Sequence, residues 1–148
     1  MARSKAEGAD ARCLFCRVVA REVEAAIVFE DQDALGFLDH RPLFPGHCLL
    51  IPKEHRETLA DLPVGSIGPF FRSAQALSAA VERAMRAEGS FVAINNRVSQ
   101  SVSHLHVHIV PRTKGDGLRG FFWPRQKYKD EAHLRETQAA IQAALSPG

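Results

Sequence analysis

Long apolar runs are missing from this sequence of 148 residues. No stretch approaches the roughly 18 consecutive apolar residues of a membrane-spanning helix, so we expect no membrane segment. Residues 1–11 are small and polar without an apolar centre, so we also expect no secretion signal. Net charge is low, because 19 Lys and Arg oppose 17 Asp and Glu. Such a balance argues against a general nucleic-acid-binding protein.

Cysteine is scarce as well, with only Cys13, Cys16 and Cys48. An odd number without a signal argues against a disulfide framework and favours a reducing, cytoplasmic location. The length fits one domain, and 45% hydrophobic residues are enough for a packed core. We expect a disordered leader over residues 1–11 and a single domain over 12–148, with a C-terminal extension from about residue 112.

Hydrophobic periodicity predicts the strands. Residues 26–30 and 34–38 are apolar runs separated by the polar Asp31-Gln32-Asp33, which is typical of a hairpin. Residues 47–51, 90–94 and 104–110 are expected to form three further strands. Because the connections are short, the fold class is α+β with a five-stranded, mostly antiparallel sheet.

One long helix and two shorter ones are expected beside this sheet. The long helix is predicted to have its N-cap at Ser66 and a left-handed residue after its end at Gly89. Its inward face is expected to comprise Ile67, Phe70, Phe71, Ala74, Leu77, Val81 and Met85. The shorter helices are predicted over 14–21 and 130–145, the latter with Leu134, Ile141 and Leu145 inward.

Three histidines alternate with apolar residues in the predicted strand 104–110. Because successive side chains of a strand alternate in direction, His104, His106 and His108 share one face. Leu105 and Val107 then point into the core. The pattern has two other interpretations, a solvated histidine face and a three-histidine metal site.

Further polar residues precede this strand. His47 opens the predicted strand 47–51, and His55 follows its end. Asp39 is either a ligand for hydroxyl groups or an ordinary turn carboxylate. The polar loop 95–102 could hold phosphate oxygens through amides, hydroxyls and backbone N–H groups, or could be a plain hairpin loop.

The segment 104–110 resembles the signature of the histidine triad (HIT) family, in which three histidines alternate with apolar residues. The similarity continues in Phe37-Leu38-Asp39, Pro45-Gly46-His47, Ile51-Pro52-Lys53 and Gln100-Ser101-Val102. It covers about residues 13–112 and is of the bacterial, Hint-like type. The resemblance implies a five-stranded antiparallel sheet, a homodimer with one site per subunit, and nucleotidyl hydrolysis or transfer.

The resemblance also implies roles for individual residues. His106 would be the nucleophile that attacks the α-phosphorus of a nucleotide, assisted by His108, His47 and Ser101. Nucleotide binding would involve Phe15, Val18, Phe37 and His40 around the base, Asp39 at the ribose hydroxyls, and Asn95 and Gln100 near the phosphate. Physical chemistry supports the nucleophile, because a neutral imidazole is available near pH 7 and splits one hard step into two easier ones. A backbone carbonyl near His104 could hold the required tautomer.

Cys13 and Cys16 form a single Cys-x-x-Cys pair, which alone cannot fill a tetrahedral metal site. Two buried thiols on a helix would give the same pattern. The resemblance implies a structural Zn²⁺, one per chain, completed by His55 and His104. Cys48 alternates within an apolar strand and is expected to be inert core.

Residues 111–129 form a basic segment that contains the aromatic run Phe121-Phe122-Trp123-Pro124. It either completes the substrate pocket or packs at a subunit interface. Three hypotheses follow for the whole chain: a nucleotidyl hydrolase or transferase, a non-catalytic nucleotide-binding module, and a three-histidine metal enzyme. The expected partners are a purine nucleotide or its conjugate, such as a dinucleoside polyphosphate or nucleoside phosphoramidate, and a second copy of the chain, without membrane or nucleic acid.

Overall fold

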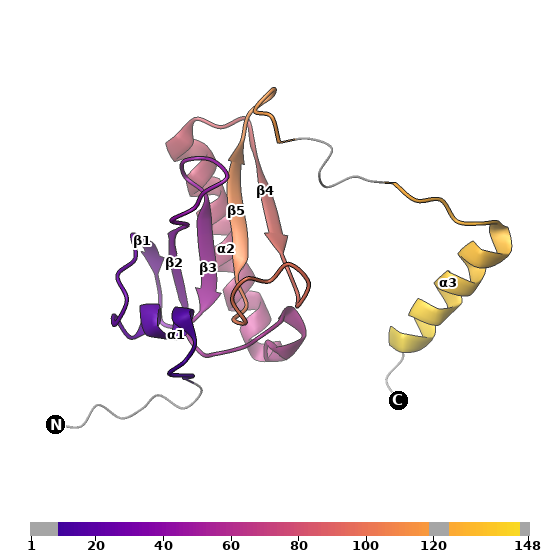
Figure 1. Ribbon diagram of the computed structural model, residues 1–148, viewed down its shortest axis with the longest axis horizontal. Coiled ribbons are helices and arrows are strands. Elements are labelled where there is room, and N and C mark those ends of the chain that lie inside the picture. Colours follow the sequence, from indigo (N-terminus) through magenta and orange to yellow (C-terminus); the bar gives the residue numbers. More distant parts are fainter. Residues whose placement is uncertain (1–8, 119–124, 146–148) are drawn as a thin grey trace. The chain divides into compact units, whose positions relative to one another are not determined.

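The computed structural model describes residues 9–118 and 125–145 (Figure 1). The chain divides into two compact units, Met1–Asp116 and Gly117–Gly148, and each is described by itself. Residues 1–8 of the predicted leader and 121–124 of the predicted extension lie outside the described residues. Among the residues described, no helix combines the length and apolarity that crossing a membrane requires.

The larger unit contains a five-stranded antiparallel sheet. Its strands lie in the order β1 (Ile27–Glu30), β2 (Ala34–Leu38), β3 (Cys48–Pro52), β5 (Val107–Arg112) and β4 (Gly89–Ile94). The β1–β2 hairpin turns where the Asp31 carboxylate accepts the N–H groups of Asp33 and Ala34. The predicted α+β class and the five antiparallel strands are therefore confirmed.

Both faces of the sheet are covered by apolar side chains. On one face lies α2 (Val64–Met85), which runs behind the sheet in Figure 1 and contributes Phe70, Ala74, Leu77 and Val81 to the core. The short α1 (Leu14–Val19) packs through Phe15 and Val18 against the other face. Because side chains alternate along β3, Cys48 and Leu50 face α2, whereas Leu49 and Ile51 face α1.

The predicted ends of α2 are wrong. The N-cap is Pro63 instead of Ser66, and the N–H of Ser66 already donates to the Pro63 carbonyl at 2.8 Å. The left-handed residue at the other end is Arg86, with φ of 49°, while Gly89 begins β4. The buried stripe is also narrower than predicted, because Ile67, Phe71 and Met85 are 41%, 38% and 42% exposed.

The histidine strand begins later than predicted. β5 starts at Val107, so His104 and His106 lie in the irregular segment before it. The N–H of Leu105 donates to the carbonyl of Arg56, outside the sheet ladder. Alternation nevertheless extends back through this segment, since Leu105, Val107 and Ile109 are all fully buried in the α2-facing core as predicted.

The smaller unit contains α3 (Glu131–Leu145). Its start follows from Asp130, whose carboxylate accepts the N–H of His133 at 2.8 Å. Within the described part of this unit, no helical residue is buried, and Ile141 and Leu145 are 58% and 77% exposed. The predicted inward packing of this helix would require contact with the larger unit, so it stays a prediction.

A tight loop joins β2 to β3. The N–H of Asp39 donates to the carbonyl of His47 at 2.9 Å, and the N–H of His47 donates to that of Phe44 at 3.0 Å. Gly46 has φ of 96°, and a Cβ there would lie 2.6 Å from Cγ of Met85. This glycine lets the chain turn beneath the end of α2 and places His47 at the start of β3.

We expect Gly46→Ala to lower the free energy of unfolding by about 1–3 kcal/mol. The alanine would have to adopt a backbone conformation with positive φ, and its Cβ would clash with the side chain of Met85. The matched control is Gly89→Ala, where a Cβ meets nothing within 4 Å and φ is not left-handed. It should stay within about 0.5 kcal/mol of the parent chain. Denaturant titration measures both, and equal stability of the two variants would contradict this account.

Candidate active site and metal centre

A cavity of about 810 Å³ opens on the α1 side of the sheet. Its apolar lining includes Val18 as well as Phe15 and Phe37, whose rings make an edge-to-face contact at a centroid distance of 5.4 Å. Its polar lining comprises Asp39, His40, Ser101, His106 and His108. The structure therefore brings most of the residues expected at a nucleotide site into one cavity.

His106 lines this cavity and is 3% exposed. Its Nδ1 is 2.7 Å from the carbonyl oxygen of His104. Because a carbonyl can only accept, Nδ1 carries the proton and Nε2 of the neutral ring has a free lone pair. The edges of Phe15 and His108 confine the ring, at centroid distances of 5.2 and 4.9 Å. This geometry leaves an unprotonated Nε2 in a residue that lines the cavity.

The buried His47 and the half-buried His108 form a pair beside His106. Nε2 of His47 is 3.0 Å from Nδ1 of His108 and 3.7 Å from the Asp39 carboxylate. Burial and then the neighbouring imidazoles of His106 and His47 lower the pKa of His108 to about 4, while Asp39 opposes them. Burial likewise lowers the pKa of His47. Both rings are therefore neutral near pH 7.

The polar loop 95–102 contributes fewer polar groups to the cavity than expected. Of its residues, Ser101 and Val102 line the cavity, whereas Asn95 and Gln100 are not among the described residues that do. Both polar groups of the Gln100 amide make hydrogen bonds. Its oxygen accepts the N–H of Arg97 at 2.8 Å, and its nitrogen donates to the carbonyl of Glu57 at 2.6 Å. Gln100 therefore braces the loop that presents Ser101.

Backbone groups are the functional elements that sequence reasoning missed. The N–H of Leu43 donates to Nδ1 of His47 at 3.0 Å, and the carbonyl of Pro52 lies 2.8 Å from Nε2 of His104. Every non-proline residue carries an N–H, so its identity gives no signal. The only available signal was the cluster of Pro42, Pro45 and Gly46, which marks an unusual loop.

A second cluster gathers the four predicted metal ligands, Cys13, Cys16, His55 and His104, whose donor atoms all lie within 4.8 Å of one another. Sγ of Cys13 is 3.4 Å from Nδ1 of His104, and Sγ of Cys16 is 3.4 Å from Nδ1 of His55. The Nε2–H of His104 donates to the Pro52 carbonyl, which leaves Nδ1 free. Tetrahedral zinc needs sulfur–nitrogen separations of about 3.5 Å, so this donor set fits the ion.

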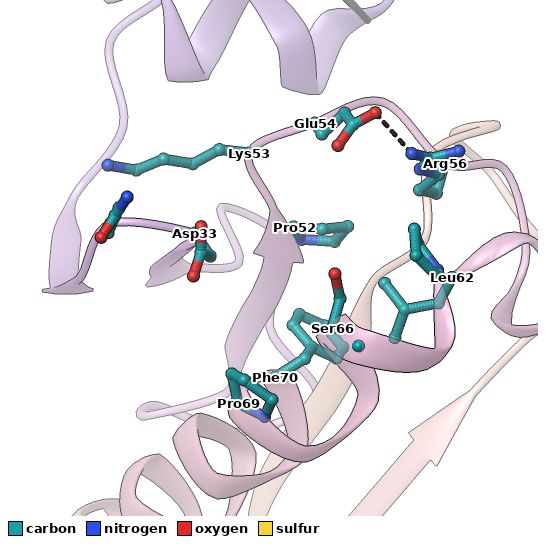
Figure 2. Close-up of a pocket in the computed structure, with 12 residues that line it drawn as sticks. Asp33, Pro52, Lys53, Glu54, Arg56, Leu62, Ser66, Pro69 and Phe70 are labelled. Atoms are coloured by element: carbon teal, nitrogen blue, oxygen red, sulfur yellow. Dashed lines mark hydrogen bonds and ion pairs between the residues drawn. The ribbon is translucent and has the colours of Figure 1, made fainter.

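A smaller cavity of about 240 Å³ lies where β3 ends and α2 begins (Figure 2). Lys53 and Arg56 line it, but Lys53 pairs with Glu30 at 2.9 Å and Arg56 pairs with Glu54. No histidine is among the described residues around it. Its charges are balanced locally, so the larger cavity is the candidate active site.

The lowered pKa of the half-buried His108 predicts how the free energy of unfolding depends on pH. Its pKa is about 4 in the folded chain and near 6.5 when unfolded, so protons bind preferentially to the unfolded chain between these values. The contribution of the neutral His108 to the free energy of unfolding is complete above pH 6.5 and is lost as pH falls toward 4. In His108→Gln, which stays neutral, the fall in unfolding free energy between about pH 7 and about pH 5 should be smaller. Denaturation at both pH values tests this, and an unchanged fall in the variant would contradict it.

Comparison with known proteins agrees with this arrangement. The family model described as HIT domain matches residues 20–115. Protein hit from Bacillus subtilis is 35% identical over 139 residues, which cover 90% of this chain and 94% of that protein. Adenosine 5'-monophosphoramidase HNT1 from Saccharomyces cerevisiae is 33% identical over 122 residues, covering 80% of this chain and 73% of that protein.

Solved structures show the same fold. SMU.412c from Streptococcus mutans superposes with a TM-score of 0.85 at 31% identity, covering 96% of this chain and 90% of that chain. A Zn-bound histidine triad family protein from Mycobacterium smegmatis gives a TM-score of 0.68 at 34% identity, covering 90% and 97%. With His106 and His108 of the triad lining one cavity and a family match over most of its length, this chain belongs to the histidine triad family.

Proposed function

We propose that this chain is a nucleotidyl hydrolase or transferase that acts at the α-phosphorus of a nucleotide conjugate. The observation that carries the proposal is the tautomer of His106, whose Nδ1–H is held by the His104 carbonyl while Nε2 remains free. The name of the yeast relative, an adenosine 5'-monophosphoramidase, supports hydrolysis of such conjugates.

The lining of the cavity suggests how a nucleotide binds. A purine base would pack among the apolar side chains of Phe15, Val18 and Phe37, near His40. The Asp39 carboxylate would accept hydrogen bonds from the ribose hydroxyls. The α-phosphate would then lie beside His106. Gln100 acts on this site indirectly, by bracing the loop of Ser101, and Asn95 has no assigned contact.

In the proposed mechanism, Nε2 of His106 attacks phosphorus and forms a P–N bond. The bond from phosphorus to the leaving group breaks, and the leaving group departs with the bonding electrons. Hydrogen-bond donors from Ser101 and His108 stabilise the charge on the phosphate oxygens, and the His104 carbonyl stabilises the charged ring. Water, or another acceptor in a transferase, then breaks the P–N bond. In hydrolysis, the hydroxyl of water stays on phosphorus. The proton of that water restores the one that the leaving group takes from the site as it departs, so that protons balance over the cycle.

We expect His106→Ala to lower kcat at least about 1000-fold on a nucleoside phosphoramidate, because no other lone pair replaces Nε2. Nucleotide affinity should change little. His133→Ala, which alters a histidine of α3, is the control and should retain activity. Steady-state kinetics and intact mass of the acid-quenched protein measure turnover and the nucleotidyl adduct.

A His106→Ala protein that kept more than a few per cent of kcat would disprove the covalent route. Nucleotide binding by the parent chain without adduct or turnover would favour the alternative, a non-catalytic nucleotide-binding module. A substrate panel with one nucleotide and varied leaving groups, including dinucleoside polyphosphates, would identify the preferred bond.

We further propose that Cys13, Cys16, His55 and His104 hold one structural zinc ion per chain. The sulfur–nitrogen distances of 3.4 and 3.6 Å around His104 support this, as does the Zn-bound relative from Mycobacterium smegmatis. Two thiolates and two imidazoles complete a tetrahedron without a place for water. The ion would therefore stabilise the fold by joining α1 to the segments after β3 and before β5.

Cys13→Ser should lower zinc content and melting temperature together, because three remaining ligands hold the ion less tightly. Cys48→Ser is the matched control, because Cys48 is buried in the α2-facing core and is not one of the four ligands. This variant protein should keep its zinc. Elemental analysis and thermal unfolding measure the effect. A parent protein without metal, or one whose melting temperature a chelator leaves unchanged, would return both cysteines to the role of core thiols.

Homodimer formation and a cytoplasmic location stay predictions. Light scattering at micromolar concentration tests the first, and a monomer would contradict it. The contribution of the basic segment after residue 112 to the substrate pocket or to a subunit interface also stays a prediction.

A further inference from the structure

The ring of His47 is fixed by contacts on both of its nitrogens. The ring is 3% exposed, and the backbone N–H of Leu43 donates to Nδ1 at 3.0 Å. Its Nε2 lies 3.0 Å from Nδ1 of His108. The loop that carries Leu43 is itself closed by the bonds from Asp39 to His47 and from His47 to Phe44. The donor and the ring therefore belong to one closed loop.

The tautomers of two histidines follow from these contacts. A neutral imidazole has one N–H and one lone pair, and a backbone N–H can only donate. Nδ1 of His47 must therefore accept from Leu43, which places the proton on Nε2. That proton points to Nδ1 of His108, because the Asp39 carboxylate at 3.7 Å is beyond hydrogen-bond distance. Nδ1 of His108 is then an acceptor, and its own proton lies on Nε2.

We propose that the backbone N–H of Leu43 is a positioning group that makes His108 present an N–H, and not a lone pair, to the cavity that it lines. With the opposite tautomers, a lone pair would face an anionic phosphate, which would be repulsive. This catalytic consequence rests on the proposed function, whereas the tautomers do not. The charged or titratable groups that face His47 are Asp39, at the end of β2, and His106 and His108, from the triad segment.

The same bonding excludes an alternative use of these residues. Donor atoms of Asp39, His47 and His108 lie within 4.8 Å of one another and could in principle ligate a metal ion. A metal would need the lone pair of His47 Nε2, but this nitrogen carries the proton while Nδ1 accepts from Leu43. The trio is therefore a hydrogen-bonded chain that ends in a donor.

Long-range ¹H–¹⁵N spectra of the ¹⁵N-histidine-labelled full chain test the tautomers directly. We expect His47 and His108 to be protonated on Nε2, and His106 on Nδ1 because of its bond to the His104 carbonyl. Assignment uses the single histidine variants. A proton on Nδ1 of His47 would overturn the proposal, whatever reaction the protein catalyses.

Leu43→Pro removes the N–H, and Leu43→Ala retains it while removing a side chain that is 49% exposed. We expect Leu43→Pro to lower kcat about tenfold or more with KM changed much less, and to shift His47 to mixed tautomers. Leu43→Ala should keep the parent kcat and tautomers. A Leu43→Pro protein with the parent kcat would overturn the proposal.

A second pair of variants serves if proline prevents folding. In His47→Gln the amide nitrogen can occupy the place of Nε2 and donate to His108. In His47→Asn the oxygen can occupy the place of Nδ1 and accept from Leu43, but no donor reaches His108. We expect His47→Gln to retain several-fold more turnover than His47→Asn. A higher kcat in His47→Asn than in His47→Gln would refute the positioning role of the Leu43 N–H. Failure of the proposed function itself would appear separately, as a parent chain that forms no adduct on His106.

Discussion

The hydrogen bond from Nδ1–H of His106 to the carbonyl of His104, at 2.7 Å, is the contact on which the site depends. It decides which ring nitrogen is free, and that choice separates a nucleophile from an inert buried histidine. The His104 carbonyl can fix the His106 ring because hydrogen bonds hold both the His104 side chain and the backbone of the next residue. The ring of His104 is bound to Pro52, and the next N–H, of Leu105, is bound to Arg56.

His104 thereby belongs to two sites at once. Its ring is one donor of the Cys₂His₂ cluster, and its carbonyl orients the reactive ring. Phe15 has a similar double position, because it lies between Cys13 and Cys16 in the sequence and contacts the rings of both His104 and His106. The cysteine cluster and the cavity therefore share His104 and Phe15 as direct structural connections.

The fold class and the gathering of the site could be predicted from the sequence because both depend on side chains. Alternation placed Leu105, Val107 and Ile109 in one core, and the family resemblance indicated the groups around the cavity. The ends of α2 could not be predicted, because Pro63 caps without a side-chain bond and Arg86 adopts a conformation that usually favours glycine. The hydrogen bond from the N–H of Leu43 to His47 could not be predicted either, because only the folded loop brings this N–H to the imidazole. Gln100 was assigned by likeness, and its packing gives it a different partner.

The burial of Cys48 gives the chain a built-in reporter. This residue is 2% exposed, its Sγ–H donates to the carbonyl of Gly46 with an Sγ–O distance of 3.3 Å, and burial raises the pKa of the thiol. Alkylating reagents attack thiolates, so they meet an inert residue here while Cys13 remains partly accessible. The slow labelling of Cys48 would therefore time the opening of β3, the strand at the centre of the sheet, in a chain that carries no added probe.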